Sequence, residues 1–126
     1  MVSSIAEVDM ARQLIDQCVR EVEEEGVVFR RPDIGVMIEV PAAVYQAEAL
    51  LKRVDFLSVG SNDLVQYMLA VDRNNAQVAG LYQEFHPAVL KALKQVADAA
   101  IKAGKGVGIC GEMAGNPGAA LLLMAM

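Results

Sequence analysis

A single stretch, Asp55–Arg73, limits what this chain can fold into more than any other part of the sequence. It begins with a short apolar run, Phe56–Val59, whose length and following glycine are typical of a buried strand. Small and polar residues form an expected tight turn, Gly60–Asp63, and from Leu64 apolar residues return at helical spacing up to Arg73, which ends the run. Because α/β folds bind ligands at the carboxyl ends of their strands, this polar turn is a candidate binding site.

The beginning of the chain predicts a helix and a loop. Ser4 and Glu7 form a capping box, which starts the helix, and Gly26 is expected to end it. Cys18 falls on the apolar stripe of this helix, so we expect it to pack in the core. The glutamates near the helix end could suggest a metal site, but they are more typical of a solvated helix face. Residues 27–33 predict a surface loop.

The remaining sequence alternates strands and helices. An apolar strand is predicted over Ile34–Val40, and Pro41 is well placed to begin the next helix, Ala42–Lys52. The single histidine, His86, precedes another proline, and we expect it to be an ordinary loop residue rather than a catalytic base. The last predicted elements are a helix from Pro87 to Gly104, a strand over Val107–Ile109 and a helix over Gly118–Met126.

This order predicts an α/β fold of parallel strands with alternating helices. Three strands cannot close a barrel, and a complete eight-stranded barrel takes about 250 residues, whereas the chain has 126. We therefore expect an incomplete TIM (β/α)8 barrel, about half of one, rather than a small complete three-stranded sandwich. Because such a sheet has two unpaired edges, we also expect self-association into a homo-oligomer.

Composition argues against several classes of function. The net charge of −5 disfavours nucleic-acid binding, which requires clustered lysines and arginines. The uncharged segment Ala119–Met126 is far shorter than the ~18 apolar residues of a membrane span. No secretory leader is recognisable, so we expect a cytoplasmic protein whose two cysteines, Cys18 and Cys110, are free thiols.

Polar side chains stand at the ends of all three predicted strands: Glu39, then Asn62 with Asp63, then Cys110 with Glu112. In a parallel βα fold these ends share one edge of the sheet, so the groups should converge. A carboxylate such as Glu39 costs several kcal/mol at a buried strand end unless it is paired or bound to a metal. Glu39 and Asp63 together would offer the hard oxygen ligands that Mg²⁺ prefers.

The other polar groups suit a phosphorylated substrate. Arg73 and Asn62 can hold a phosphate by charge and by amide donation, and Cys110 is in position to give or take a proton. Each feature has a structural alternative: Asn62 and Asp63 could cap the following helix, and Cys110 could be a small buried hydrophobe. Three polar strand ends together nevertheless favour a site.

These residues carry a resemblance to a known family. The segment GSNDLVQYMLAVDR, followed by CGEMAG and preceded by IEVPAA, resembles the phosphoenolpyruvate-utilising enzymes. The likeness covers nearly the whole chain and is greatest to the Enzyme I group of the phosphoenolpyruvate-dependent phosphotransferase system. The AVDRNN and GVMIEVPAAVY segments are more similar to the nitrogen-related form than to the sugar-transport form.

The resemblance implies a role for each candidate residue. Glu39 and Asp63 would ligate Mg²⁺, while Asn62 and Arg73 would contact the phosphate of phosphoenolpyruvate. Cys110 would be the acid that protonates the enolate to give pyruvate. Gly111 and Glu112, carried along in the motif, would only support the site, and Gln66, which also belongs to the motif, is expected to be structural.

The resemblance also implies that the chain is one part of a larger enzyme. It would be a partial phosphoenolpyruvate-binding barrel over residues 1–126, without the first strands, the last strand and the domain whose histidine accepts the phosphoryl group. That histidine would pass the group to a phosphocarrier protein. Because the histidine would lie on a separate domain, we expect this chain alone to be inactive.

Two other readings compete with this one. A Mg²⁺-dependent lyase of the aldolase or citrate-lyase kind also places Glu and Asp on a metal beside a G-x-x-D-L turn, but needs neither Arg73 nor the Cys110-Gly-Glu sequence. A barrel without catalytic activity could instead serve as a regulatory module. Hard oxygen ligands leave the choice between Mg²⁺ and Mn²⁺ open.

Overall fold

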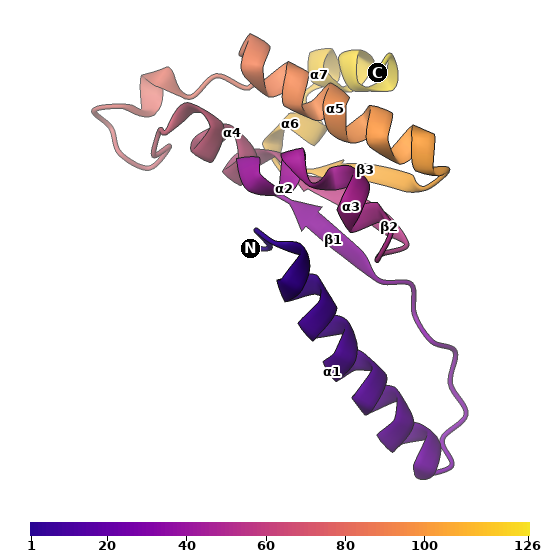
Figure 1. Ribbon diagram of the computed structural model, residues 1–126. Coiled ribbons are helices and arrows are strands. Elements are labelled where there is room, and N and C mark those ends of the chain that lie inside the picture. Colours follow the sequence, from indigo (N-terminus) through magenta and orange to yellow (C-terminus); the bar gives the residue numbers. More distant parts are fainter.

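The computed structural model describes residues 1–126 and contains one three-stranded parallel sheet with the strand order β1-β2-β3. The strands are β1 (Gly35–Ile38), β2 (Phe56–Gly60) and β3 (Gly106–Cys110), and helices separate them along the chain (Figure 1). The expected α/β fold with parallel strands is therefore confirmed. The sheet is open, as in part of a TIM-like barrel, because three strands leave β1 and β3 as edges.

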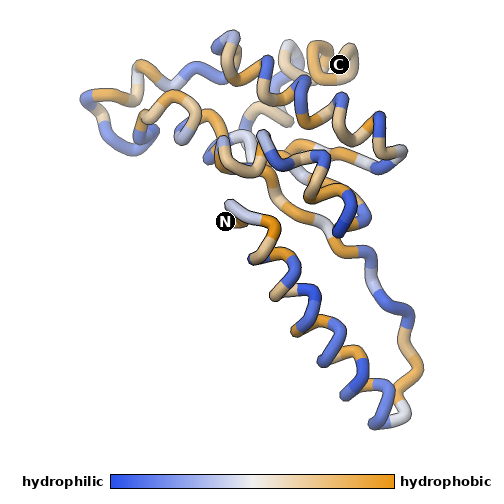
Figure 2. The backbone as a smooth tube through the Cα atoms, in the orientation of Figure 1, coloured by the Kyte–Doolittle hydropathy of each residue, from blue (hydrophilic) through white to orange (hydrophobic).

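Helix α1 (Ile5–Glu24) begins at the predicted capping box. The amide of Glu7 donates to Ser4 Oγ at 3.4 Å, and the amide of Ser4 donates back to Glu7 Oε2 at 2.9 Å. The expectation that Cys18 packs in the core is wrong, since Cys18 is an exposed free thiol and Val8 is the only buried residue of the helix. The physical reason is that α1 extends away from the sheet (Figure 1), so the far half of its apolar stripe (orange in Figure 2) lacks a covering element.

The predicted helix Ala42–Lys52 is divided into α2 (Pro41–Tyr45) and α3 (Ala47–Leu51). Pro41 begins α2, as expected, but Gln46 leaves helical geometry with φ −103° and ψ 6°. Its side-chain amide donates to the carbonyl oxygens of Ala42, at 2.9 Å, and Ser3, at 2.8 Å. The break therefore connects the start of α1 to the helices that cover β1.

Helix α4 (Ser61–Leu69) differs from the prediction at both ends. It begins directly after β2 with no separate turn, so Asn62 and Asp63 lie in its first turn. It ends before Arg73 because Ala70 adopts a left-handed conformation with φ 52°. Arg73 therefore lies in a loop, which continues through the short 3-10 helix η1 (Ala79–Leu81).

Helix α5 (Pro87–Ala103) begins at the predicted proline and ends at Gly104. His86 caps it, because its Nδ1 accepts the amide of Ala88 at 3.2 Å, so the loop role expected for the histidine is confirmed. Ile101, near the end of this helix, is 67% exposed. The chain finishes with α6 (Glu112–Gly115) and α7 (Pro117–Met124), where one last helix was expected.

The two faces of the sheet differ in cover. In β1 and β2 the side chains that alternate toward the helices are buried, as for Ile38 and Leu57 with no exposed area, whereas Val107 of the edge strand β3 is 38% exposed. Those that alternate toward the opposite face stay open, with Met37 41% and Phe56 40% exposed. Helices therefore cover one face, and the other is accessible in this chain. No helix combines the length and apolar character that crossing a bilayer requires.

Candidate functional site

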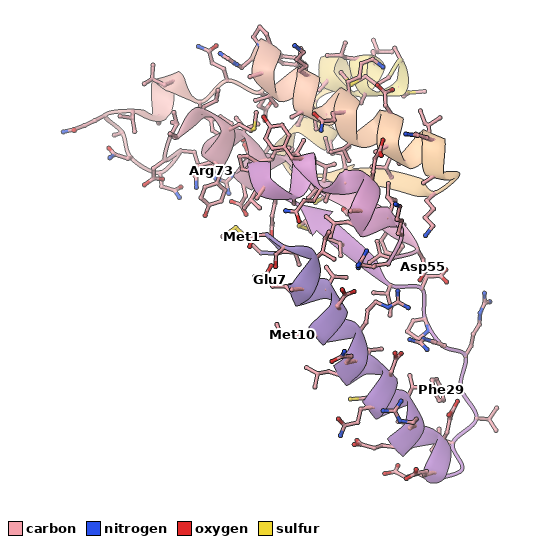
Figure 3. The ribbon with its side chains drawn as sticks, in the orientation of Figure 1. Met1, Glu7, Met10, Phe29, Asp55 and Arg73 are labelled. Carbon is pink, nitrogen blue, oxygen red and sulfur yellow. The ribbon has the colours of Figure 1, made fainter.

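The carboxyl edge of the sheet forms one row of backbone positions. The pairing sets Ile38 opposite Val59 and Gly60 opposite Cys110, so Glu39, directly after Ile38, stands level with Gly60 and Cys110. Since adjacent strands lie about 4.8 Å apart, the two ends of this row are separated by roughly 10 Å. Figure 3 shows Arg73 near this edge and Asp55 at the opposite end of the sheet. The predicted strand ends thus share one edge.

Glu39 lies against the end of the neighbouring strand. A Cβ placed on Gly60 would be 3.1 Å from Glu39 Cβ and 3.2 Å from its Oε2 atom, so the absence of a side chain at Gly60 leaves room for the carboxylate. The side chain of Glu39 is only 14% exposed. Its ion-pair partner is the amino group of Met1, at the long distance of 3.9 Å. Glu39 is therefore a largely buried carboxylate beside the start of α4.

Asn62 and Asp63 occupy the first turn of α4, where the helix dipole favours anions. Neither side chain caps the helix, because Gly60 is the cap residue and no side-chain cap bond is present. Asn62 Oδ1 instead accepts the backbone amide of Glu112 at 3.0 Å. With its oxygen engaged in this way, the amide nitrogen of Asn62 is the group of this side chain that can still donate a hydrogen bond.

Cys110 ends β3 with an exposed thiol, so the alternative of a small buried hydrophobe is wrong. Its Sγ donates to the carbonyl oxygen of Val59 at 3.4 Å, a contact that requires the thiol proton, and lies 4.0 Å from Ser58 Oγ. Its own carbonyl oxygen accepts Ser61 Oγ at 2.7 Å. These contacts link Cys110 to both the end of β2 and the start of α4.

Gly111 permits the close approach between the β3–α6 turn and α4. Its φ of +97° is strained for other residues, and an added Cβ would lie 2.4 Å from Ser61 Oγ and 2.8 Å from Asn62 Oδ1. Sequence analysis gave this glycine only a supporting role. The structure shows that a glycine is required to bring the second and third strand ends together.

Arg73 reaches the site from the loop after α4. Its Nη1 lies 3.2 Å from Glu112 Oε1, and its backbone amide donates to Gln66 Oε1 at 3.2 Å. Sequence analysis did not predict either contact. The opposite charges of Arg73 and Glu112 at the ends of neighbouring strand units were the available signal for the first.

Tyr82 is a second residue that sequence analysis missed. Its hydroxyl lies 3.5 Å from the carbonyl oxygen of Asn62, which folds the loop after α4 back over the start of that helix. Burial raises the pKa of Tyr82, the charge of Glu84 acts in the same direction, and Arg73 opposes both. A recess of about 560 Å³ beside Tyr82 is lined by Gln83, Glu84, Phe85 and Glu112.

The structure therefore brings the five predicted site residues to one edge of the sheet, four from strand ends or the helix start and one, Arg73, from a loop. No group of three or more His, Cys, Asp or Glu side chains in the chain is arranged so that it could hold a metal ion by itself. The possible metal ligands at this edge are the pair Glu39 and Asp63, which provides two carboxylates. Such a pair suits a hard cation that also takes oxygens from water and substrate.

Comparisons of this chain with a family model and with individual known proteins agree with one another. The family model described as "PEP-utilising enzyme, PEP-binding domain" matches residues 1–126. Proteins named "Phosphoenolpyruvate-dependent phosphotransferase system" from Salmonella typhimurium and Escherichia coli are each 51% identical to the whole of this chain. A Haemophilus influenzae protein named "Phosphoenolpyruvate-protein phosphotransferase" is 46% identical over the same extent. The chain covers 17% of the first two proteins and 22% of the third.

Proposed function

Because this chain belongs to the phosphoenolpyruvate-utilising enzymes, we propose that it supplies the phosphoenolpyruvate site of a phosphoenolpyruvate-protein phosphotransferase. The observation that carries the proposal is the row Glu39–Gly60–Cys110, with Asn62 and Asp63 in the helix turn beside it. It places carboxylates, an amide donor and a thiol along one edge of the sheet. The remaining strands and the phosphorylated histidine would come from other parts of the enzyme.

Glu39 and Asp63 would hold Mg²⁺. The fit rests on the chemistry of the donor set and on the burial of Glu39, whose side chain is only 14% exposed. When bound, the ion supplies positive charge to the phosphate and carboxylate oxygens of the substrate. Phosphoryl transfer depends mainly on such neutralisation and on positioning.

Asn62 and Arg73 would bind the phosphate of the substrate. The Asn62 amide is oriented by its bond from the Glu112 backbone, so its nitrogen is available as a donor. Arg73 is permanently charged, and its guanidinium can donate to two phosphate oxygens at once. The helix dipole of α4 adds a favourable field for the same anion.

Cys110 would complete the reaction. The bond between phosphorus and the enol oxygen breaks as a phosphorus–nitrogen bond forms on the acceptor histidine, and the electron pair stays with the enolate. The Cys110 thiol then gives its proton to the methylene carbon, which yields pyruvate, and the thiolate regains a proton from water. The contact from Sγ to Val59 O holds the sulfur at the strand end, on the accessible face of the sheet.

The histidine would lie on a separate domain and pass the phosphoryl group to a carrier protein. His86 of this chain is not a candidate for that role, since its Nδ1 caps α5. We expect this chain alone to bind substrate weakly and to be inactive in transfer. The nitrogen-related branch, suggested by the AVDRNN segment, remains a prediction.

Titration with Mg²⁺ and oxalate, which mimics enolpyruvate, tests this proposal. The protein to use is the full-length polypeptide, meaning the whole enzyme of which this chain would form one part. Asp63→Ala should weaken Mg²⁺-dependent oxalate binding by at least about a hundredfold, since a metal contact contributes several kcal/mol. Asp98→Ala is the matched control, because Asp98 is exposed on α5 and pairs with Lys94. Equal oxalate binding by Asp63→Ala and the wild type would contradict the assignment of the metal ligand.

A further inference from the structure

Glu112 contacts both residues that would bind the phosphate. Its carboxylate accepts Arg73 Nη1 at 3.2 Å, and its backbone amide donates to Asn62 Oδ1 at 3.0 Å. The two contacts differ in kind: the amide contact orients Asn62 whatever the side chain is, whereas the carboxylate contact occupies the guanidinium of Arg73. A ligand phosphate needs that same guanidinium.

The Arg73–Glu112 ion pair is weak enough for another anion to replace Glu112. The side chain of Glu112 is 74% exposed and that of Arg73 is 34% exposed, so water screens the pair. Gln66 holds the backbone of Arg73 by a separate bond of 3.2 Å, so the loop does not depend on Glu112 for its position. A phosphate that carries two charges and offers bidentate geometry is a stronger partner for arginine than one exposed carboxylate.

We propose that Glu112 is a displaceable counter-ion, which occupies Arg73 in the ligand-free site and gives way to the phosphate of the substrate. Its carboxylate therefore sets how tightly the site takes phosphate-bearing ligands, as opposed to ligands with carboxylates alone. This inference rests on the function proposed above for the same site. It assigns Glu112 a positioning role through Arg73 that its place in the CGE sequence does not reveal.

Binding of two ligands, one with a phosphate and one without, distinguishes this role of Glu112 from a purely structural role. Phospholactate carries the phosphate of phosphoenolpyruvate but cannot release an enolate, and oxalate carries no phosphate. In the full-length polypeptide with Mg²⁺, Glu112→Gln should tighten phospholactate binding about two- to fivefold, because an exposed ion pair no longer competes for Arg73. It should leave oxalate binding unchanged, which a disturbed fold would not do.

Two further variants make the test specific. Glu48→Gln removes the same charge from another exposed ion pair, with Lys102 at 3.0 Å on the helix-covered side, and should alter neither ligand. In an Arg73→Ala background, Glu112→Gln should no longer change phospholactate binding, since the competition has no target. A gain that persists in this background would show general charge repulsion and overturn the inference.

The outcomes also separate this inference from the proposed function. If the wild type binds neither ligand, the proposed function fails and the inference fails with it. If the wild type binds both and Glu112→Gln weakens phospholactate binding or leaves it unchanged, the inference alone is wrong. Tightening restricted to phospholactate and dependent on Arg73 would support it.

Discussion

The two faces of the sheet differ in what their residues do. On the helix-covered face, Ile38 and Leu57 are completely buried and belong to one apolar core. On the accessible face lie Met37 of β1, Glu39 directly after β1, and Cys110 at the end of β3. Because side chains alternate along a strand, one short run of residues supplies both faces. The buried core and the proposed site are therefore one residue step apart along a strand.

The chemical face also depends on contacts that the core does not use. Ser61, Asn62 and Glu112 connect neighbouring strand ends by hydrogen bonds through polar atoms, and Gly111 allows their close approach. The core face is held by apolar packing, which tolerates changes of similar volume. We therefore expect substitutions on the two faces to have different signatures, in catalysis on one and in stability on the other.

The largest effect is expected at Cys110. Cys110→Ala removes the proposed proton donor, so pyruvate formation by the full-length polypeptide should fall about 10²- to 10⁴-fold. Mg²⁺-dependent oxalate binding should persist, because the substitution leaves Glu39 and Asp63 in place. Cys18→Ala, at the other exposed thiol, is the matched control and should keep the wild-type rate. An unchanged rate of pyruvate formation in Cys110→Ala would remove the thiol from the mechanism.

The next largest effect is expected in the free energy of unfolding, which substitutions on the two faces should lower by different amounts. Leu57→Ala, in the central strand and fully buried, should lower the free energy of unfolding by about 2–5 kcal/mol. Met37→Ala, on the accessible face with 41% exposure, should cost less than about 1 kcal/mol. Urea unfolding of this chain and the two variants measures both values. Similar losses at the two positions would mean that the faces are equally packed.

A smaller effect is expected at the turn that joins the strand ends. Gly111→Ala should lower the free energy of unfolding by about 1–3 kcal/mol and weaken oxalate binding, because the new Cβ would enter the space of Ser61 Oγ and Asn62 Oδ1 at a positive φ. Gly115→Ala is the control, since no atom lies within 4 Å of its added Cβ. Equal behaviour of the two variants in unfolding and titration would show that the turn is free to relax.

The smallest effect concerns α1, which lies outside the comparison of the two faces. Hydrogen bonds from the backbone amides of Ser3 and Ser4 lower the pKa of Glu7 from its ordinary 4.5. A carboxyl whose pKa is lower in the folded state stabilises that state above its unfolded pKa, and the contribution is lost as pH falls through the folded pKa. NMR titration should therefore give Glu7 a pKa below 4.5. Glu7→Gln should make the helicity of α1 less sensitive to pH in this acid range, and an identical acid response would contradict the cap.

Much of the fold was predictable because its signals are local. The capping box of α1, the prolines that begin α2 and α5, and Gly104 at the end of α5 each act on the adjacent turn. The errors arose where distant contacts decide. The predicted helix is interrupted at Gln46, whose side chain binds the carbonyl oxygen of Ser3, and Cys18 stays exposed because no helix or strand lies over its part of α1.

The shared edge of the candidate site residues was predictable from the sequence, but the contacts between them were not. Glu39, Asn62 and Cys110 follow apolar runs, so the rule that parallel strand ends share an edge was sufficient to group them. The pair of Arg73 with Glu112 and the approach of Tyr82 to Asn62 depend on how a loop folds back over α4. No periodicity in the sequence encodes that path.

The central claim is that this edge of the sheet serves phosphoryl transfer from phosphoenolpyruvate. The most direct measurement incubates the full-length polypeptide with phosphate-labelled phosphoenolpyruvate and Mg²⁺, and follows protein-bound phosphate together with pyruvate. The account predicts an acid-labile, base-stable protein phosphate and released pyruvate, both lost in Asp63→Ala. Absence of any protein phosphate in the wild type would contradict the account and favour a metal-dependent lyase.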